Sequence, residues 1–567
     1  MLSLPVLALG NNAYHVKVSG SSSGNGSKTN PWNLQTALNH PQKVAAGDTI
    51  WVHGGVYHGA FVSKLWGSAN NPIIVRAVPG EQVILDGNGY NGDGVLSFEG
   101  RYTWIWGLTI TTSNTNRNDD KDVVFFIGSN NKLINCTVSN GGGNGVGLWK
   151  TAIDSEIYGC IIYHNGYIGD TRGHGHGVYI QNETGTKLVR NNVIFNSYGV
   201  GIHVFGETAH IRGYNIEENT MFNCGLPYGM LERHILIGGN QPVERAHVKS
   251  NLFYNRQNIS SKAMMQFGYS YGTTNKSAEF TGNYMVDGSY YCIAHWDSMR
   301  VTENTIISHS ENMQLIAFDP TYFNIGHPYF NYNTYHKGNL GLLSFNEWQN
   351  VTGEDANSTY SADEPTATCY FVNKNIYEEG RANITVYNWA GSNSVNVDVS
   401  NVLNTGDEYE LFDTSNLAVG AIASGTFNGN SISVPMQLTE VELPNGVTNG
   451  GTLYVHTAPH FGAFVLRRTK ENAGTSSVER KTLSGLTVYP NPVNESVTVT
   501  FQSETAGKIT LEVTDSAGRI VFSETVGSCL GQNSYTHNIS FLQAGLYIIA
   551  VNDSKNLLNA KLIVARK

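Results

Sequence analysis

The chain is 567 residues long, 14% of them charged, and it carries a formal net charge of −10. This length allows two to four domains with a large core, and the 62 glycines and 30 tyrosines favour strands and tight turns over helices. The negative charge argues against nucleic acid or an anionic membrane as the partner. An acidic polysaccharide stays open, because a cleft can be locally basic.

The chain begins with a short apolar run, Leu2–Leu9, which is too short to span a bilayer. We expect residues 1–12 to be the remainder of a signal peptide or a disordered start. No later segment approaches transmembrane length, so we expect no transmembrane segment. Asn30–Leu38, with Pro31 near its first turn, predicts a short amphipathic helix that caps the core of the following repeats.

Short apolar strands follow in Ala46–Gly59, Asn71–Arg76 and Val83–Gly87. This stretch resembles the opening coils of the pectate-lyase-like superfamily, especially the alginate lyase and chondroitinase B group. The resemblance implies a right-handed parallel β-helix, which we assign with its cap to residues 13–349. It also implies β-elimination from an acidic polysaccharide, with calcium or an arginine neutralising the uronate carboxylate. The lysine and arginine that act in the alginate lyase group match no motif in this chain.

Two short apolar units alternate from about Gly94 to Phe318. The first is entered through glycines, and its copies include Gly145–Trp149, Gly177–Gln181 and Gly199–His203. The second often starts with Asn, and its copies include Asn192–Asn196, Asn219–Asn223 and Asn251–Asn255. Repeats at a spacing of roughly 20–35 residues indicate a solenoid. Because each copy is too short to bury its own apolar face, the copies must stack, and the leading Asn fits a ladder position at a turn.

Strand alternation predicts which side chains point outward from the middle coils. With Val146 and Leu148 inward, Trp149 faces out, and the same count places Tyr179, Gln181 and His203 outward. We expect Trp149, Gln181 and His203 to form one exposed file with Tyr179 beside it, continued by His234, Gln266 and His295.

These residue types suit a sugar-processing site. We predict catalytic roles for His203, Tyr179, Arg233 and His176, and substrate-binding roles for Trp149, Lys150, Gln181, Arg172 and His234. Histidine and tyrosine transfer protons when their pKa is tuned, and arginine binds a carboxylate in bidentate fashion. The duller alternatives are that His176 satisfies backbone groups and that Trp149 and Tyr179 shield strand edges.

Other polar groups receive structural interpretations. Asn118–Asp122 has oxygen ligands that suit calcium, but a solvated loop is favoured, so we assign no metal site and keep calcium as the one cofactor considered. Lys187 and Arg190 are expected to be solvated charges. Cys136 and Cys160 are expected to meet between neighbouring coils as buried thiols rather than as a disulfide.

The repeat fades after Tyr335, and residues 350–368 read as a polar linker. Residues 369–468 change to alternating short strands with Gly, Asn and Asp turns, Thr452–His456 among them, which indicates an antiparallel β-sandwich. Residues 469–484 form a second linker. The predicted fold class is therefore all-β.

The C-terminal segment, residues 485–567, carries Leu486–Asn494, Asp515–Arg519 and Leu542–Tyr547. These motifs resemble the C-terminal sorting domain of the type IX secretion system of Bacteroidota. The resemblance implies a small β-sandwich, the secretion machinery as a partner, and a secreted or cell-surface protein.

The favoured function is a secreted polysaccharide lyase acting on a uronate-containing polysaccharide, and we expect a monomer. One alternative is a glycoside hydrolase on the same fold, which needs converging carboxylates. The other is a non-catalytic glycan-binding protein or adhesin that uses the same outward stripe.

Overall fold

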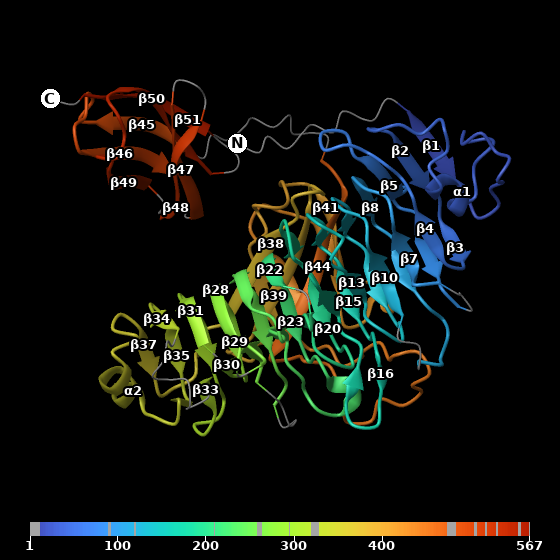
Figure 1. Ribbon diagram of the computed structural model, residues 1–567, viewed down its shortest axis with the longest axis horizontal. Coiled ribbons are helices and arrows are strands. Elements are labelled where there is room, and N and C mark those ends of the chain that lie inside the picture. Colours follow the sequence, from blue (N-terminus) through green and yellow to red (C-terminus); the bar gives the residue numbers. More distant parts are fainter. Residues whose placement is uncertain are drawn as a thin grey trace. The chain divides into compact units, whose positions relative to one another are not determined.

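The fold is all-β and divides into two compact units, one ending at Asn472 and one beginning at Ala473 (Figure 1). The computed structural model describes residues 12–88, 92–117, 121–208, 210–257, 263–270, 272–293, 295–318, 328–472, 483–503, 507–515, 519–528, 531–553 and 557–565. Residues 1–11, part of the predicted signal remnant, lie outside these ranges. Among the described residues, no helix is both long and apolar enough to cross a membrane.

Three parallel sheets make up the β-helix of the first unit, and within each sheet the strands stack in chain order. The first sheet contains β1 (Ala13–Val16), β2 (Thr49–Val52), β5 (Ile73–Ala77), β8 (Thr103–Trp106), β11 (Lys132–Ile134), β14 (Glu156–Tyr158), β19 (Lys187–Arg190), β22 (Ile211–Glu217), β25 (Val243–Lys249), β28 (Thr274–Thr281), β31 (His295–Thr302) and β34 (Tyr329–Asn331). The second sheet contains β4 (Phe61–Ser63), β7 (Gly94–Phe98), β10 (Asp122–Phe126), β13 (Val146–Leu148), β18 (Val178–Ile180), β21 (Ile202–Val204), β24 (Ile235–Ile237), β27 (Met265–Phe267), β30 (Tyr290–Cys292), β33 (Gln314–Phe318) and β36 (Asn339–Leu340). The third sheet contains β3 (Gly55–His58), β6 (Val83–Asp86), β9 (Thr109–Thr111), β12 (Thr137–Ser139), β15 (Ile161–Tyr163), β20 (Val193–Phe195), β23 (Thr220–Phe222), β26 (Leu252–Tyr254), β29 (Tyr284–Val286), β32 (Thr305–Ile307), β35 (Thr334–His336) and β37 (Thr359–Ser361).

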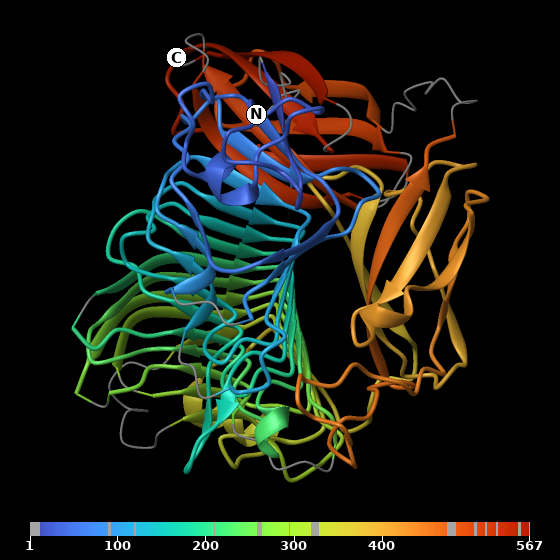
Figure 2. The same ribbon diagram turned by 90° about the vertical axis from the view of Figure 1, so that its right-hand side faces the viewer.

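Each coil passes through the second, first and third sheets in turn, as in β13, β14 and β15. Successive coils stack in register, so that Val146 lies opposite Val178 and Leu148 opposite Ile180. Such positions fill one continuous buried core, which none of the short strands could form alone. Figure 2 shows the stacked strands. The predicted right-handed parallel β-helix is confirmed.

An asparagine ladder, made by Asn192, Asn219, Asn251, Asn283, Asn304 and Asn333, stabilises the turn between the first and third sheets. The backbone N–H and Nδ2 of Asn219 both donate to Oδ1 of Asn251, at 3.0 and 2.9 Å. The left-handed conformation falls on the preceding residue, for example Glu218 with φ 58°, and not on the ladder residue itself. This arrangement pairs buried amides that would be costly to leave unsatisfied.

Helices close both ends of the β-helix. At the start, α1 (Leu34–Leu38) is capped by the side chain of Asn33, and its leucines are buried, which agrees with the predicted cap. At the other end, α2 (Phe345–Thr352) buries Trp348, whose Nε1 donates to Asp355 at 2.8 Å. Because β37 pairs with β35, residues predicted as a linker continue the β-helix as far as Ser361.

An antiparallel sandwich follows within the same unit. Its larger sheet orders β38 (Cys369–Lys374), β39 (Arg381–Tyr387), β44 (Phe461–Lys470), β41 (Glu408–Asp413) and β42 (Ala421–Thr426), and its smaller sheet pairs β40 (Ser394–Val397) with β43 (Ile432–Pro435). The predicted strand at Thr452–His456 is wrong. This segment is a loop whose carbonyl oxygens on Thr452 and Leu453 accept hydrogen bonds from the Arg256 guanidinium.

The second unit is also antiparallel. One sheet orders β45 (Leu483–Tyr489), β46 (Ser496–Ser503) and β49 (Gly531–Asn538), and the other orders β48 (Ile520–Ser528), β47 (Gly507–Asp515), β50 (Gly545–Asn552) and β51 (Leu557–Val564). Of the predicted linker 469–484, Thr469 and Lys470 belong to β44, and residues 473–482 lie outside the described ranges.

The cysteines follow the expectation of thiols. Cys136 and Cys160 are free and buried, and their neighbours Thr137 and Ile161 lie opposite each other in adjacent coils. The Cys160 N–H donates to Asn192 Oδ1 at 2.8 Å, so Cys160 occupies the position before the first ladder amide.

Candidate functional site

The outer face of the second sheet carries two rows of side chains in the middle coils. One row is Gly147, Tyr179 and His203, which lie directly opposite one another on β13, β18 and β21. The other row consists of Trp149, Gln181 and Phe205. Each of these residues comes two positions after a member of the first row. The five side chains of these two rows are partly exposed, and Gly147, which has no side chain, is buried.

The predicted register of His203 is therefore wrong, because this residue was expected beside Gln181. Trp149, Gln181 and His203 do lie in neighbouring coils and face outward, but His203 aligns with Tyr179. The cause is the core, because stacking Ile202 on Val178 and Val204 on Ile180 fixes the register of the whole strand.

Aromatic rings run along this face. The ring centroids are 5.3 Å apart for Trp149 and Tyr179, 5.6 Å for Tyr179 and His203, and 5.1 Å for His203 and Phe205. Phe205 meets Tyr269 at 5.0 Å, and Tyr269 is 48% exposed. An array of partly exposed rings is a surface on which sugar rings can stack.

His176 and His203 form a hydrogen-bonded pair, with His176 Nε2 3.0 Å from His203 Nδ1. His176 Nδ1 accepts the Val200 N–H at 3.1 Å, so neutral His176 carries its proton on Nε2 and donates it to His203. Neutral His203 must then carry its own proton on Nε2, and this buried atom has no hydrogen-bond partner among the described residues. Desolvation lowers the pKa of His203 to about 3 and that of His176 well below its usual value.

The pair therefore presents one N–H donor at neutral pH. His203 cannot accept a proton through Nε2 in this arrangement, because that nitrogen already carries one. A neutral imidazole held in a fixed tautomer polarises an oxygen atom or donates to it. The alternative that His176 only satisfies backbone groups holds for its Nδ1, which binds the Val200 N–H. It does not hold for its Nε2, which binds His203.

Asp122 lies beneath Trp149 on the same face and is 3% exposed. Its Oδ2 accepts from Trp149 Nε1 and its Oδ1 from Asn144 Nδ2, both at 2.8 Å. Desolvation raises the pKa of Asp122 to about 6. A Cβ at Gly147 would come within 1.9 Å of Asp122 Oδ2, so only glycine leaves room for this carboxylate. The solvated-loop prediction is wrong for Asp122, and Asn118–Asp120 lie outside the described residues.

Asn144 links this carboxylate to the histidine pair. Its Nδ2 donates to Asp122, and its Oδ1 accepts the His176 N–H at 3.0 Å. The Trp149 indole, the Asp122 carboxylate and the His176 backbone are thus held by one chain of hydrogen bonds. Such a fully paired network fixes side-chain positions more firmly than isolated contacts do.

Lys187 holds the ends of the two central strands. It is fully buried, in contrast to the solvated charge predicted for it, and its Nζ donates to the carbonyl oxygens of Leu148, Trp149 and Gln181. Three acceptors match the three donors of an ammonium group, although burial lowers the pKa of Lys187 to about 7. Arg190 is only partly exposed and pairs with Glu217 at 3.1 Å.

Cationic side chains surround the face. Arg172 and Lys150 are exposed. Arg233 is partly buried, donating from Nε to Gln266 Oε1 and pairing with Glu232 at 3.3 Å. Arg172 and Arg233 lie close enough to His203 to help lower its pKa. Gln181 donates from Nε2 to the Tyr179 hydroxyl at 3.3 Å.

The predicted continuation of the stripe does not hold. His234 is fully buried and its Nε2 lies 3.1 Å from the Tyr254 carbonyl oxygen, so this ring is out of reach of a ligand on the surface. Gln266 is also buried. His295 belongs to β31 of the first sheet, because the coil turns away from the second sheet before this residue.

Asp122, Asn144 and Phe205 are the site residues that sequence reasoning missed. Phe205 comes two residues after His203, just as Gln181 comes two residues after Tyr179. Had His203 been aligned with Tyr179, Phe205 would have been predicted to face outward beside Gln181. Asp122 stands at the head of an apolar strand, where a single carboxylate is an unusual choice. Among the described residues, no cluster of three or more His, Cys, Asp or Glu side chains has metal-binding geometry.

Two regions of the chain match known protein families. Residues 14–156 match the family described as "Pel9A-like, right handed beta helix region", and residues 487–565 match "Secretion system C-terminal sorting domain". The chain therefore contains an N-terminal region similar to the Pel9A-like right-handed β-helix and a C-terminal region similar to secretion sorting domains. The sorting domain indicates export by the type IX system to the cell surface or outside. A search of curated proteins finds no match.

Solved structures with a similar fold include pectate lyase Pel9A, at 15% identity and TM-score 0.37, covering 63% of this chain and 78% of that one. A rhamnogalacturonan lyase covers 52% and 82%, at 15% identity and TM-score 0.41. A mannuronic acid specific family 6 polysaccharide lyase from human gut microbiota covers 62% and 91%, at 12% identity and TM-score 0.36. At 12–15% identity and TM-scores of 0.36–0.41, these likenesses carry no argument about the activity of this chain.

Proposed function

We propose that this β-helix protein is a secreted polysaccharide lyase that binds a uronate-containing glycan along the outer face of its second sheet. The observation that carries the proposal is the unpartnered Nε2–H of His203. The His203 ring lies between the rings of Tyr179 and Phe205, and the nearby charges of Arg172 and Arg233 help lower its pKa. A buried donor without a partner is costly, and a carboxylate oxygen of the substrate would satisfy it.

The residues divide naturally between binding and proton transfer. Trp149, Tyr179 and Phe205 provide stacking surfaces for sugar rings. Arg172 and Arg233, with the His203 N–H, neutralise the uronate carboxylate and so make the neighbouring carbon more acidic. Burial raises the pKa of Tyr179, so its protonated hydroxyl can donate a proton to the leaving glycosidic oxygen. A solvent water takes the proton from the neighbouring carbon, and the carbon–carbon double bond forms as the glycosidic carbon–oxygen bond breaks.

The test uses the full chain with alginate, polygalacturonate and chondroitin, following the absorbance of newly formed unsaturated ends. We expect one of these substrates to be cleaved, and His203→Gln, Tyr179→Phe and Arg233→Gln each to reduce the rate by about 100-fold or more. His295→Gln is the matched control, since it removes a partly exposed histidine from the first sheet. Unchanged rates in the three variants would refute the site, and binding without cleavage would favour the glycan-binding alternative.

Hydrolysis is the second candidate function, because the pKa of Asp122 is raised to about 6, as a general acid requires. Asp93 is exposed and contributes to this rise. Both oxygens of Asp122 are already hydrogen-bonded, which places this candidate second. New reducing ends without unsaturation, abolished by Asp122→Asn, would establish hydrolysis and exclude elimination.

A further inference from the structure

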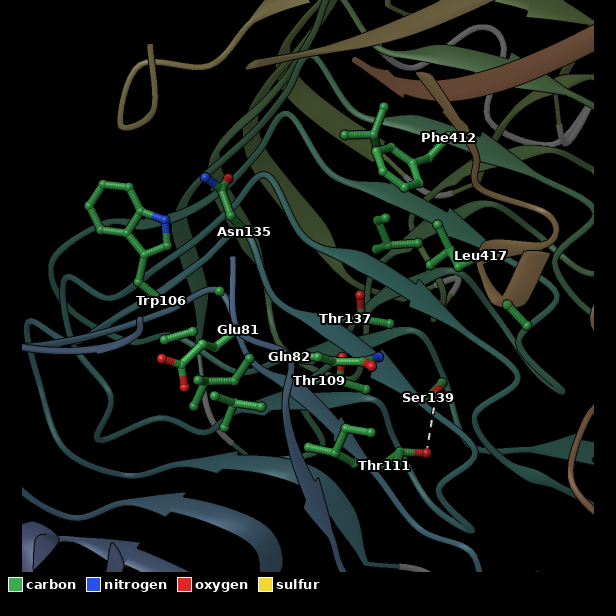
Figure 3. A pocket seen from close by; sticks show the side chains of 18 of the residues that line it. Glu81, Gln82, Trp106, Thr109, Thr111, Asn135, Thr137, Ser139, Phe412 and Leu417 are labelled. Atoms are coloured by element: carbon green, nitrogen blue, oxygen red, sulfur yellow. Dashed lines mark hydrogen bonds between the residues drawn. The ribbon is translucent and has the colours of Figure 1, made fainter. Parts of the chain in front are cut away.

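A cavity of about 810 Å³ separates the early coils of the third sheet from the sandwich (Figure 3). This volume lies within the range of roughly 300–1,000 Å³ typical of ligand pockets. One wall is formed by β9 and β12, and the other includes Phe412 of β41 and Leu417 of the 3-10 helix η2 (Leu417–Val419). The cavity is on a different sheet from the site described above.

The outer residues of the third sheet change character where the cavity begins. In the early coils they are Thr109 and Thr111, then Thr137 and Ser139, and all four line the cavity. In later coils they are mostly apolar and pack with Tyr387, Phe461 and Val465 of the sandwich. Thr111 and Ser139 share a hydrogen bond of 3.2 Å. The sequence thus places a hydroxyl-rich wall where the two layers separate.

Three arginines line the same cavity: Arg76, Arg381 and Arg467. Arg381 and Arg467 are direct neighbours across β39 and β44, an arrangement that is destabilising for like charges. Aromatic rings hold two of the guanidinium groups. Arg76 lies 4.2 Å from the ring centroid of Trp106, and Arg467 lies 4.2 Å from that of Phe412.

The hydrogen-bonding capacity of these arginines is poorly used. Arg381 is 9% exposed. Within the part of the chain that the structure describes, the Nε atoms of both Arg381 and Arg76 are buried without a partner. The carboxylate nearest to Arg381 is Glu378, at 3.7 Å, and it also accepts from Asn135 Nδ2 at 2.8 Å. Buried guanidinium donors without acceptors point to a missing anion.

The acidic residues of the cavity are already engaged. Glu442 accepts from the Tyr163 hydroxyl at 2.9 Å, and burial raises its pKa. Glu81 accepts the Gly54 N–H at 2.7 Å and lies 3.3 Å from His53. Asp86 accepts from Ser113. Glu410 lies opposite Arg467 on β41, and Glu378 lies 3.7 Å from Arg381. Even with these carboxylates nearby, the Nε atoms of Arg76 and Arg381 have no acceptor among the described residues.

We propose that this cavity is a second glycan-binding site, which holds a short acidic oligosaccharide without cleaving it. A carboxylate or sulfate group binds Arg76, Arg381 and Arg467, and sugar hydroxyls bind Thr109 and Thr137. The ligand class agrees with the proposed function, but the site depends on none of the second-sheet residues.

The test is calorimetric titration of the full chain with tri-galacturonate, with neutral maltotriose as the ligand control. We expect tri-galacturonate to bind, and Arg381→Gln or Arg467→Gln to weaken binding about tenfold each, the loss expected for one charge-assisted hydrogen bond. Arg467 is exposed, so its variant keeps the fold even if Arg381→Gln does not. Lys470→Gln is the matched control, since this exposed lysine lies on the same strand and pairs with Glu408 outside the cavity.

Further titrations separate this site from the second sheet. In an Arg233→Gln background, the effect of Arg467→Gln should persist even if all lyase activity is lost. Thr137→Val should weaken tri-galacturonate but leave competition by inorganic sulfate unchanged. Equal binding by Arg467→Gln and the parent protein would overturn the proposal, as would complete loss of binding in Arg233→Gln alone or equal binding of maltotriose.

Discussion

The second and third sheets of this β-helix share one core but present opposite kinds of outer face. Outside the second sheet, Trp149, Tyr179 and His203 are partly exposed, and Nε2 of His203 has no hydrogen-bond partner among the described residues. Outside the third sheet, Phe195 and Phe222 are buried against Phe461 and its neighbours in the sandwich. Stacking in register fixes both faces equally, so the difference lies entirely in the outward residues.

This contrast shows that the residues that stabilise the fold and those available to a ligand lie on different faces of the β-helix. A covered face contributes apolar burial, which is worth about 25 cal/mol per Å². An exposed face of rings and donors contributes little to folding and is available to a ligand. Substitutions on the two faces should therefore differ in what they change.

The largest expected effect is on the covered face. Phe461→Ala should lower the free energy of unfolding by about 3–5 kcal/mol, because it leaves a cavity between sandwich and β-helix. Phe205→Ala on the exposed face should lower it by less than about 1 kcal/mol. Urea denaturation of the two variants measures the difference, and equal losses would break the comparison.

Trp149→Phe comes next. The change keeps a ring for stacking but removes the indole N–H from the Asp122 carboxylate, and a buried acceptor that loses a donor costs about 1–3 kcal/mol. Trp66→Phe is the control, since Trp66 is 53% exposed and stacks only on a surface arginine, Arg101. If denaturation shows equal stability for both variants, Asp122 does not depend on Trp149.

The histidine pair should make stability depend on pH. The pKa of folded His203 is about 3, well below its unfolded value of about 6.5, so the unfolded chain binds more protons between these values. Stability is therefore lost as the pH falls from 6.5 toward 3. His203→Gln should reduce this slope by up to about 1.4 kcal/mol per pH unit, measured by denaturation at several pH values. An unchanged slope would mean that folding does not lower the pKa of His203.

The smallest change in stability is expected for Lys150→Ala. Lys150 is exposed, so its loss should alter the free energy of unfolding by no more than about 0.5 kcal/mol. It should nevertheless weaken binding of an acidic glycan, most clearly at low salt. Lys43→Ala, an exposed lysine near the first coils, is the control and should leave binding unchanged.

The β-helix could be predicted from the sequence because apolar residues such as Val146, Val178 and Ile202 recur, each after a glycine. The recurring asparagines mark one turn of each coil. The sequence did not predict the alignment of His203 with Tyr179 rather than with Gln181, because a shift of two residues keeps the same side chains facing outward and leaves the apolar pattern almost intact. Nor did it reveal that Lys187 is buried, since its acceptors are carbonyl oxygens from a neighbouring coil. Contacts between distant segments, such as Arg76 with the sandwich cavity, leave no local signal.

The asparagine ladder has a direction. Each amide donates toward the next coil and accepts from the previous one, and the series ends where Asn333 Nδ2 donates to Asp355 Oδ1 at 3.0 Å. A carboxylate accepts hydrogen bonds but has no proton to donate. Asp355 also accepts hydrogen bonds from the Trp348 indole and the Ser358 hydroxyl. Duplication of a whole winding at an interior position would therefore keep each ladder donor matched to an acceptor, whereas a ladder asparagine added after Asp355 would receive no hydrogen bond from it.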